Sequence, residues 1–259
     1  MIKTVPAAVV DPFTHLNGQL EKPLAWELTG LSPTPEEEWQ RMRSFLGLDQ
    51  ADLAAMVETV EPLFKRGHEL VVGNYDYLLK HHDTAVILGW EQGADPVHLA
   101  ERRRFFTVWL ARTLGLDLSD DFARYLFRAG QIHAGHGPRQ THVPELYVTG
   151  AISLVNATFA RFLAEEMPGA AVIPTALAGW NKLLSLHLHM MLLGYHSALA
   201  LDSGDFRVKA AIFGKMRALM GGPELSLALP TGATMALALR KLFNYLNFAQ
   251  IRGNMDSLI

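Results

Sequence analysis

The sequence predicts an all-α protein. Apolar residues recur at spacings of three and four along most of the chain, and the periodic segments begin and end at residues typical of helix caps. No strand pattern stands out, so nucleotide-binding folds built on a parallel sheet have no foundation here. We expect an irregular N-terminal arm over residues 1–34, a helical domain over residues 35–201, and a two-helix C-terminal extension over residues 202–259.

The first two helices carry clear start signals. Thr34 can cap a helix that begins at Pro35, and three glutamates follow in the first turn, where negative charge is favoured. Gly47 ends this helix, and Asp49 caps the next one.

A further helix is expected from Glu61 to His81, and the residues between 81 and 95 show little periodicity. Asp95 and Pro96 then open a helix that runs to about Leu114. That helix carries three aromatic residues on neighbouring lines: Phe105, Phe106 and Trp109.

An amphipathic helix follows, with Phe122, Leu126, Ala129 and Ile132 in one apolar stripe and His133 at its end. The helical pattern then breaks over a loop that holds Gly135, His136, Gly137, Pro138, Arg139 and His142. A histidine on the last turn of a helix, beside an apolar wall and a loop, is a candidate axial ligand for haem iron. The alternative is a charge complement to the helix end, or a satisfied surface group.

The remaining helices are expected over residues 143–167, 180–201 and 206–220, with a last one that begins after Pro230. The helix over residues 180–201 is apolar almost all round and therefore central. His187 and His189 point to different sides of it, so we expect no metal site there.

Composition excludes several classes of function. A net charge of −3 and a pI near 6.4 argue against a nucleic-acid surface, and a solvated helix face explains the basic run at residues 102–104. The chain has no cysteine, which removes disulfides, Fe–S clusters and thiolate ligands and fits a cytoplasmic protein. The most membrane-like stretch, Leu183 to Leu201, contains three histidines, so we expect a buried core helix and no membrane insertion.

Four stretches occur in an order that points to a family: RMRSFLGLDQADL at 41–53, NYDYLL at 74–79, RAGQIH at 128–133 with PELYVTGA at 144–151, and WNKLLSLHLHMMLLGY at 180–195. Together they resemble the globin-coupled sensor and protoglobin family, over roughly residues 36 to 200. The resemblance implies a globin-like fold, haem b as the cofactor, and a diatomic gas (O2, NO or CO) as the ligand.

The resemblance also implies roles for individual residues. His133 is expected to bind the haem iron as the proximal ligand, and Tyr75 to donate a hydrogen bond to the gas in the distal pocket. The alternative for Tyr75 is a core tyrosine whose hydroxyl reaches a backbone carbonyl. Phe105 or Phe106 should lie over the iron, with Trp109 nearby, and the choice between them depends on a helix phase that the sequence leaves open.

The loop after the proximal helix departs from the family pattern. His133 and Tyr147, the tyrosine that opens the next helix, are fourteen residues apart (147 − 133), so the loop holds an insertion. His136 could face the same way as His133, and the axial ligand is therefore His133 or His136.

The main expectation is a gas-binding or gas-sensing globin that forms a homodimer through terminal helices, as the resembled family does. A haem-active enzyme is the first alternative, because His136, Arg139 and His142 could deliver protons near the haem. A haem-free globin-like domain that binds another protein is the second.

Overall fold

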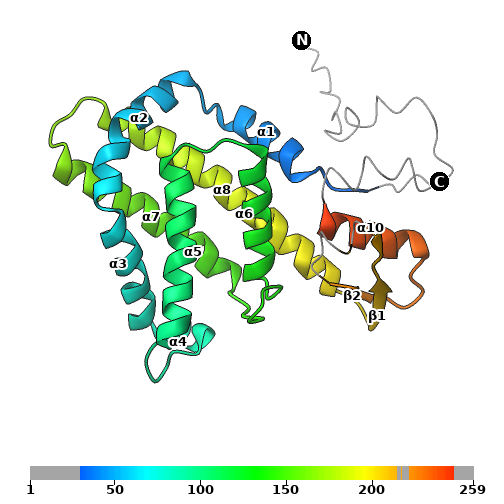
Figure 1. The fold of residues 1–259 in the computed structure, drawn as a ribbon. Helices are drawn as coiled ribbons and strands as arrows, with labels where there is room; N and C mark the ends of the chain where they lie inside the picture. Colours follow the sequence, from blue (N-terminus) through cyan, green and yellow to red (C-terminus); the bar gives the residue numbers. More distant parts are fainter. Residues whose placement is uncertain (1–29, 215–216, 218–221, 248–259) are drawn as a thin grey trace, which may run out of the picture.

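The computed structural model describes residues 30–214, 217 and 222–247, so most of the predicted N-terminal arm lies outside the described residues. The expected all-α class is confirmed for the main body of the chain (Figure 1). Its helices are α1 (Pro35–Leu46), α2 (Gln50–Lys65), α3 (Gly67–Lys80), α4 (His82–Leu88), α5 (Pro96–Leu114), α6 (Asp120–His133), α7 (Glu145–Glu166) and α8 (Ile173–Asp202).

The predicted start signals form true capping boxes. The Thr34 hydroxyl accepts from the Glu37 amide at 3.2 Å, and the Glu37 carboxylate accepts from the Thr34 amide at 2.7 Å. Asp49 and Asp52 form the same reciprocal pair at the start of α2. These bonds satisfy amide groups that the first turn of a helix leaves without a partner.

Two boundaries in the first half differ from the sequence prediction. The helix expected from Glu61 is divided, because α2 continues through Pro62 to Lys65 and Arg66 separates it from α3. The short helix α4 was not predicted, since seven residues are too few to show a period. Its end is marked by Gly89 in the left-handed conformation, at φ 69°.

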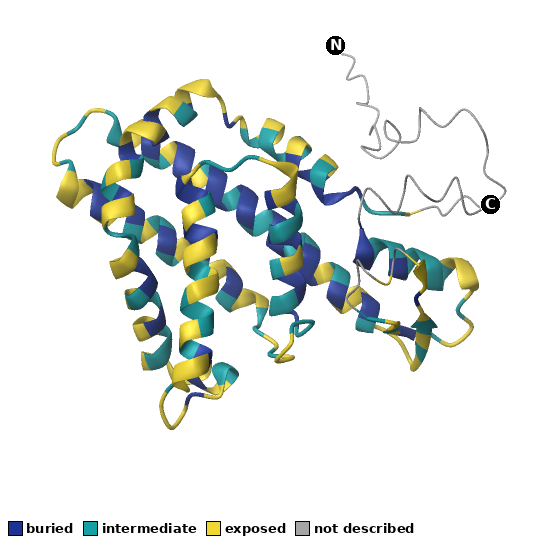
Figure 2. Cartoon of the chain, in the orientation of Figure 1, coloured by how far each residue is buried: buried dark blue, intermediate teal, exposed yellow. Residues whose placement is uncertain are grey.

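Helix α8 is the centre of the molecule. It begins at Ile173, seven residues before the predicted start, and packs on α2, α6 and α7 along its length. Figure 2 shows buried segments, in dark blue, along the helices at the centre of the molecule. The buried residues of α8 include Trp180, Leu184, Leu186, His187 and Met190. The most membrane-like stretch of the sequence is therefore a core helix, as predicted.

Within the described part of the chain, one helix, α7, is long and apolar enough to cross a membrane by length and composition alone. One such helix is weak evidence, because the core helix of a soluble protein passes the same test. The buried side of α7 carries Val148, Ile152, Val155, Phe159 and Phe162.

The C-terminal extension corrects the sequence prediction. The segment expected as a helix from Phe206 instead begins as strand β1 (Phe206–Ala211), which pairs antiparallel with β2 (Glu224–Leu229) before helix α10 (Met235–Leu246). The pairing register places Phe206 opposite Leu229. The six-residue strand escaped prediction because only Val208 and Ala210 alternate inward along it, too short a pattern to separate from a helix.

The two strands and α10 form a compact unit, here called the C-terminal unit. Its core consists of apolar residues from β2, α10 and the end of α8: Ala198, Leu201, Leu227, Leu229, Leu242, Tyr245 and Leu246. Strand β1 adds the partly buried Val208 and Ala210. Ala134, the residue after His133, is buried in the same cluster.

Candidate functional site

The position of His133 follows from the way α6 is built. Ser119 caps the helix by accepting from the Phe122 amide at 3.3 Å, and the apolar stripe buries Phe122 and Leu126 completely. His133 then falls on the last helical turn, where its Nδ1 lies 2.7 Å from the carbonyl oxygen of Ala129.

That bond determines the tautomer of the ring. A carbonyl can only accept, so Nδ1 carries the proton and Nε2 of His133 keeps its lone pair. Burial holds the pKa of the His133 imidazole below its usual 6.5, against the opposing effect of the Ala129 bond. A neutral imidazole with one nitrogen oriented by a carbonyl is the form in which histidine binds a metal.

Ion pairs at both ends show which side of α5 faces α6. Near the start of α5, Glu101 pairs with Arg139 of the loop after α6 at 3.0 Å. Near its end, Arg112 pairs at 2.9 Å with Asp121, in the first turn of α6, and its guanidinium lies 4.5 Å from the Phe122 ring. Residues 101, 105, 108 and 112 share one side of a helix, so that side of α5 faces α6.

The middle of this facing surface is apolar and incompletely covered. Phe105 is 44% exposed and Val108 is 45% exposed, although both lie between the two ion pairs. The facing line of α6 consists of Tyr125, Ala129 and His133, all partly buried. We call these five residues the α5–α6 face. Helix α5 packs mainly on α3 and α2, whereas α6 packs on α8 and α1.

Tyr75 and Phe106 lie on the other side of α5. The Tyr75 hydroxyl donates to the carbonyl oxygen of Arg102 at 2.9 Å, and burial raises its pKa to about 12. Phe106 meets the Tyr75 ring edge-on at 6.1 Å and stacks on Trp109 at 5.3 Å. Phe105 therefore points toward α6, while Phe106 points toward α3.

His136 and Tyr147 are engaged away from His133. Nε2 of His136 lies 2.8 Å from Asp202, and its Nδ1 lies 3.0 Å from the hydroxyl of Tyr245 in the C-terminal unit. The Tyr147 hydroxyl donates to Asp83 of α4 at 3.0 Å.

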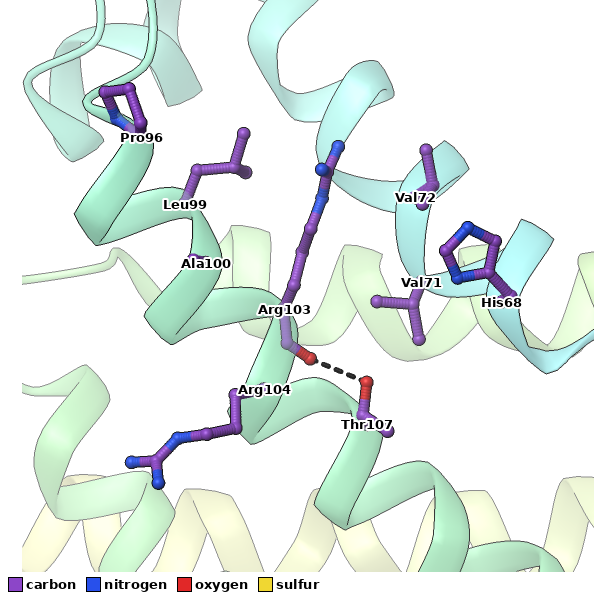
Figure 3. A pocket seen from close by; sticks show the side chains of 9 residues that line it. All are labelled: His68, Val71, Val72, Pro96, Leu99, Ala100, Arg103, Arg104 and Thr107. Carbon is purple, nitrogen blue, oxygen red and sulfur yellow. Dashed lines mark hydrogen bonds between the residues drawn. The ribbon is translucent and has the colours of Figure 1, made fainter.

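A groove of about 540 Å³ lies between α3 and α5, on the side opposite the α5–α6 face (Figure 3). His68, Val71 and Val72 of α3 line it together with Pro96, Leu99, Ala100, Arg103, Arg104 and Thr107 of α5. Figure 3 shows the Thr107 hydroxyl turned back onto the Arg103 carbonyl, to which it donates at 2.8 Å. His133 does not line this groove.

The histidines of α8 lie in different surroundings. His187 is fully buried, whereas Nε2 of His189 bonds Glu38 at 2.8 Å and Nε2 of His196 bonds Glu145 at 2.9 Å. In the described ranges of the chain, no cluster of three or more histidine or carboxylate side chains could hold a metal ion.

Comparison with known proteins assigns the chain to a family. A family model described as Protoglobin matches residues 35–200. The chain belongs to the protoglobin family. Protoglobins are globin-type haem proteins that bind or sense a gas, and this chain is one of them. No curated protein matches it. The match ends two residues before the end of α8, so the C-terminal unit lies outside the family's domain.

The residues of the α5–α6 face fit a haem. His133 offers one oriented imidazole nitrogen, and Phe105 and Val108 offer apolar surface that nothing in the described chain covers fully. Beside them, the indole N–H of Trp109 is buried with no partner among the described residues.

Sequence reasoning missed the groups that frame this face. Glu101, Arg112 and Asp121 gave no signal, since charged residues on predicted helices read as ordinary surface groups. Asp202 and Tyr245 were missed because they reach His136 across 66 and 109 residues of sequence.

Proposed function

We propose that this protoglobin binds haem b at the α5–α6 face, with His133 as the axial ligand, and takes a diatomic gas, O2 foremost, at the open iron position. The orientation of His133 is the observation that carries the proposal. Its Nδ1–H donates to the carbonyl oxygen of Ala129, and the ring lies on the side of α6 that faces α5.

Bound haem supplies an iron centre with one coordination position open to the gas. The chain supplies the rest. The carbonyl of Ala129 orients the His133 ring and makes Nε2 a stronger donor. Phe105 and Val108 would pack against the haem and exclude water from it. Contact with this flat, apolar group would bury the side-chain surface that the two residues now expose to solvent.

His133 is preferred to His136 as the ligand. Both ring nitrogens of His136 already have partners, Asp202 and Tyr245, and its side chain is only 16% exposed. Ligation by His136 would break one of these bonds.

Tyr75 is the proposed donor to the bound gas. It lies on the side of α5 away from the α5–α6 face and its hydroxyl bonds the Arg102 carbonyl, so this role requires α3 and α5 to rearrange when haem binds. One hydroxyl proton serves one acceptor at a time, so donation to the gas requires release of the Arg102 carbonyl. The net gain is therefore small, on the order of 0.5–1.5 kcal/mol.

The haem-active enzyme was suggested by the polar side chains of the loop after α6, which could deliver protons. The three polar side chains of the loop are all engaged with other groups: His136 with Asp202 and Tyr245, Arg139 with Glu101, and His142 with the hydroxyl of Tyr195 at 3.0 Å. Their partners give each a structural role, which favours gas binding over proton delivery.

A cytoplasmic homodimer is the proposed assembly. Support comes from apolar side chains exposed near the end of the described chain, where Phe206 is 45%, Phe213 79% and Met235 69% exposed. Light scattering on the full chain tests this, with twice the mass of 28.7 kDa expected and a monomer mass against it.

A haem titration tests the proposed function. The purified chain should take up one haem per protomer, give a five-coordinate ferrous spectrum, and shift sharply on addition of CO. Absence of haem uptake would replace gas binding with the haem-free interaction domain. Loss of the Soret band with reductant and O2, with a green or blue product, would favour the haem-active enzyme.

A further inference from the structure

The end of α6 is held by a chain of hydrogen bonds from the C-terminal unit. Arg128 donates to the Tyr245 hydroxyl at 3.4 Å, and that hydroxyl forms a hydrogen bond with Nδ1 of His136 at 3.0 Å. Nε2 of His136 donates to Asp202 at 2.8 Å, and Asp202 also accepts from Arg207 of β1 at 3.1 Å. Both ring nitrogens of His136 and the Tyr245 hydroxyl are therefore engaged within this chain of bonds.

A second set of bonds joins the same partners on the other side of His133. The buried side chain of Gln131 donates to the backbone oxygen of Tyr245 at 2.7 Å and accepts from Arg128 at 3.0 Å. Arg128 also donates to the backbone oxygen of His136 at 3.0 Å. Two residues before His133 and three residues after it, the chain is therefore bonded to α10.

Apolar contacts place the residue next to His133 in the same unit. Ala134 is 6% exposed and belongs to the core of the C-terminal unit, together with Tyr195 and Tyr245. Helix α6 ends at Ala134, and Gly135 follows with φ 98°, so the amides of Gly135 and His136 donate to the carbonyls of Ile132 and Gln131 at 3.1 and 3.0 Å. The contacts of Gln131 and His136 with Tyr245 add to this cap and join it to α10.

The C-terminal unit is itself firmly anchored. Lys241 of α10 donates to the backbone oxygen of Ala228 in β2 at 2.9 Å and to that of Ser203 after α8. Asn247 donates to the backbone oxygen of Pro33 at 2.7 Å. The C-terminal unit is thus bonded both to the rest of the chain and to the end of α6. A displacement of the end of α6 has to move the C-terminal unit or break these hydrogen bonds.

We propose that the C-terminal unit, together with Asp202 at the end of α8, acts as a proximal clasp: Asp202 and Tyr245, through His136, are positioning residues that fix the last turn of α6 and thereby tune the bond between His133 and the haem iron. This rests on the proposed function. Coupling of this kind is reciprocal, so occupation of the haem site has to alter the C-terminal unit in return. The clasp is then the path by which the gas site reaches the part of the chain outside the family's domain.

The first test uses the haem-free full chain. Tyr245→Phe removes one hydroxyl and keeps the packing, Asp202→Asn removes the acceptor charge, and Asp202→Glu keeps it. Amide hydrogen exchange over residues 131–143 should quicken by about 2- to 12-fold in Tyr245→Phe and Asp202→Asn, as loss of one hydrogen bond predicts. Asp202→Glu should stay closer to the parent chain.

His196→Gln is the matched control, because His196 also bonds a carboxylate, at 2.9 Å, but has no bond to α6 or α10. Its exchange over residues 131–143 should equal that of the parent chain. Unchanged exchange in both Tyr245→Phe and Asp202→Asn, or equal acceleration in His196→Gln, overturns the clasp.

The second test uses the haem-loaded chain. The iron–histidine stretching frequency and the O2 dissociation rate should both shift in Tyr245→Phe and Asp202→Asn and stay constant in His196→Gln. Haem loading should slow exchange over residues 224–246 in the parent chain and do so less in Tyr245→Phe. Faster exchange with an unchanged iron–histidine frequency would show a merely structural role and overturn the proposal.

Failure of the proposed function and failure of the clasp give different results. A parent chain that takes up no haem removes the gas site, and the exchange of the haem-free chain alone then decides whether the C-terminal unit holds the end of α6.

Discussion

Gly130 of α6 lies directly against Met191 of α8, so that a Cβ on residue 130 would stand 1.8 Å from the Met191 carbonyl oxygen. Gly194, one turn along α8, has the same relation to Phe127, at 1.9 Å. The two helices thus touch backbone to backbone at a pair of glycines. This contact sets the height and rotation of α6 on the core and hence the position of His133, three residues after Gly130.

Replacement of Gly130 by alanine should therefore be severe. The methyl group meets backbone atoms that cannot turn away, so α6 has to shift, and we expect a loss of at least 1–3 kcal/mol in the free energy of unfolding. Gly150→Ala is the control, because no atom lies within 4 Å of its Cβ position, and it should be neutral or slightly stabilising. Urea unfolding followed by circular dichroism measures both. Equal stability of the two variants would contradict the close crossing.

His187 predicts an acid-sensitive stability. Its ring is fully buried, stacked on Trp39 at 5.9 Å and edge-on to Trp109 and Phe122, and neither nitrogen has a partner among the described residues. Burial lowers the pKa of His187 to about 3, against a small opposing effect of Asp117. Below pH 6.5 the unfolded chain takes a proton that the folded chain refuses, so stability falls as the pH drops from 6.5 toward 3.

The His187→Leu variant checks this. It removes two buried polar atoms, so it should raise the free energy of unfolding at pH 7 by roughly 1–2 kcal/mol. It should also reduce the acid dependence by about 1.4 kcal/mol per pH unit between pH 6 and 4. Parallel curves for the parent chain and His187→Leu would show that His187 is protonated or solvated in the folded state.

Tyr75→Phe should have a modest effect on the gas. Because the hydroxyl is shared with the Arg102 carbonyl, we expect the O2 dissociation rate to rise by about 2- to 12-fold. The CO dissociation rate should change less, since bound CO is a poorer hydrogen-bond acceptor. Stopped-flow displacement measures both, with Tyr77→Phe, a partly exposed tyrosine on the same helix, as the control. If neither rate moves, Tyr75 has no place in the distal pocket and only supports α5.

The sequence predicts the elements that carry local signals. The capping residues Thr34, Asp49 and Asp95 lie where the structure has them, and α5 runs from Pro96 to Leu114 as predicted. The apolar stripe that ends at His133 is α6. Each of these rests on neighbours within one or two helical turns, which the sequence displays directly.

What the sequence could not predict depends on distant contacts. Phe105 faces α6 and Phe106 faces α3 because of the helix phase of α5. The ion pairs of Glu101 with Arg139 in the loop after α6, and of Arg112 with Asp121 on α6, fix that phase. Strand β1 exists because β2 pairs with it across a long connection, and its own six residues read equally well as a helix. The bonds of His136 to Asp202 and Tyr245 are of the same kind.

The measurement that bears most directly on the account is rescue of the axial ligand. In His133→Gly the haem should lose its protein ligand, and added imidazole should restore the five-coordinate ferrous spectrum and CO binding of the parent chain. His136→Gly, studied in parallel, should keep its own ligand and show no response to imidazole at the same concentration. A normal spectrum in His133→Gly without imidazole, or rescue seen only in His136→Gly, would contradict the assignment of His133.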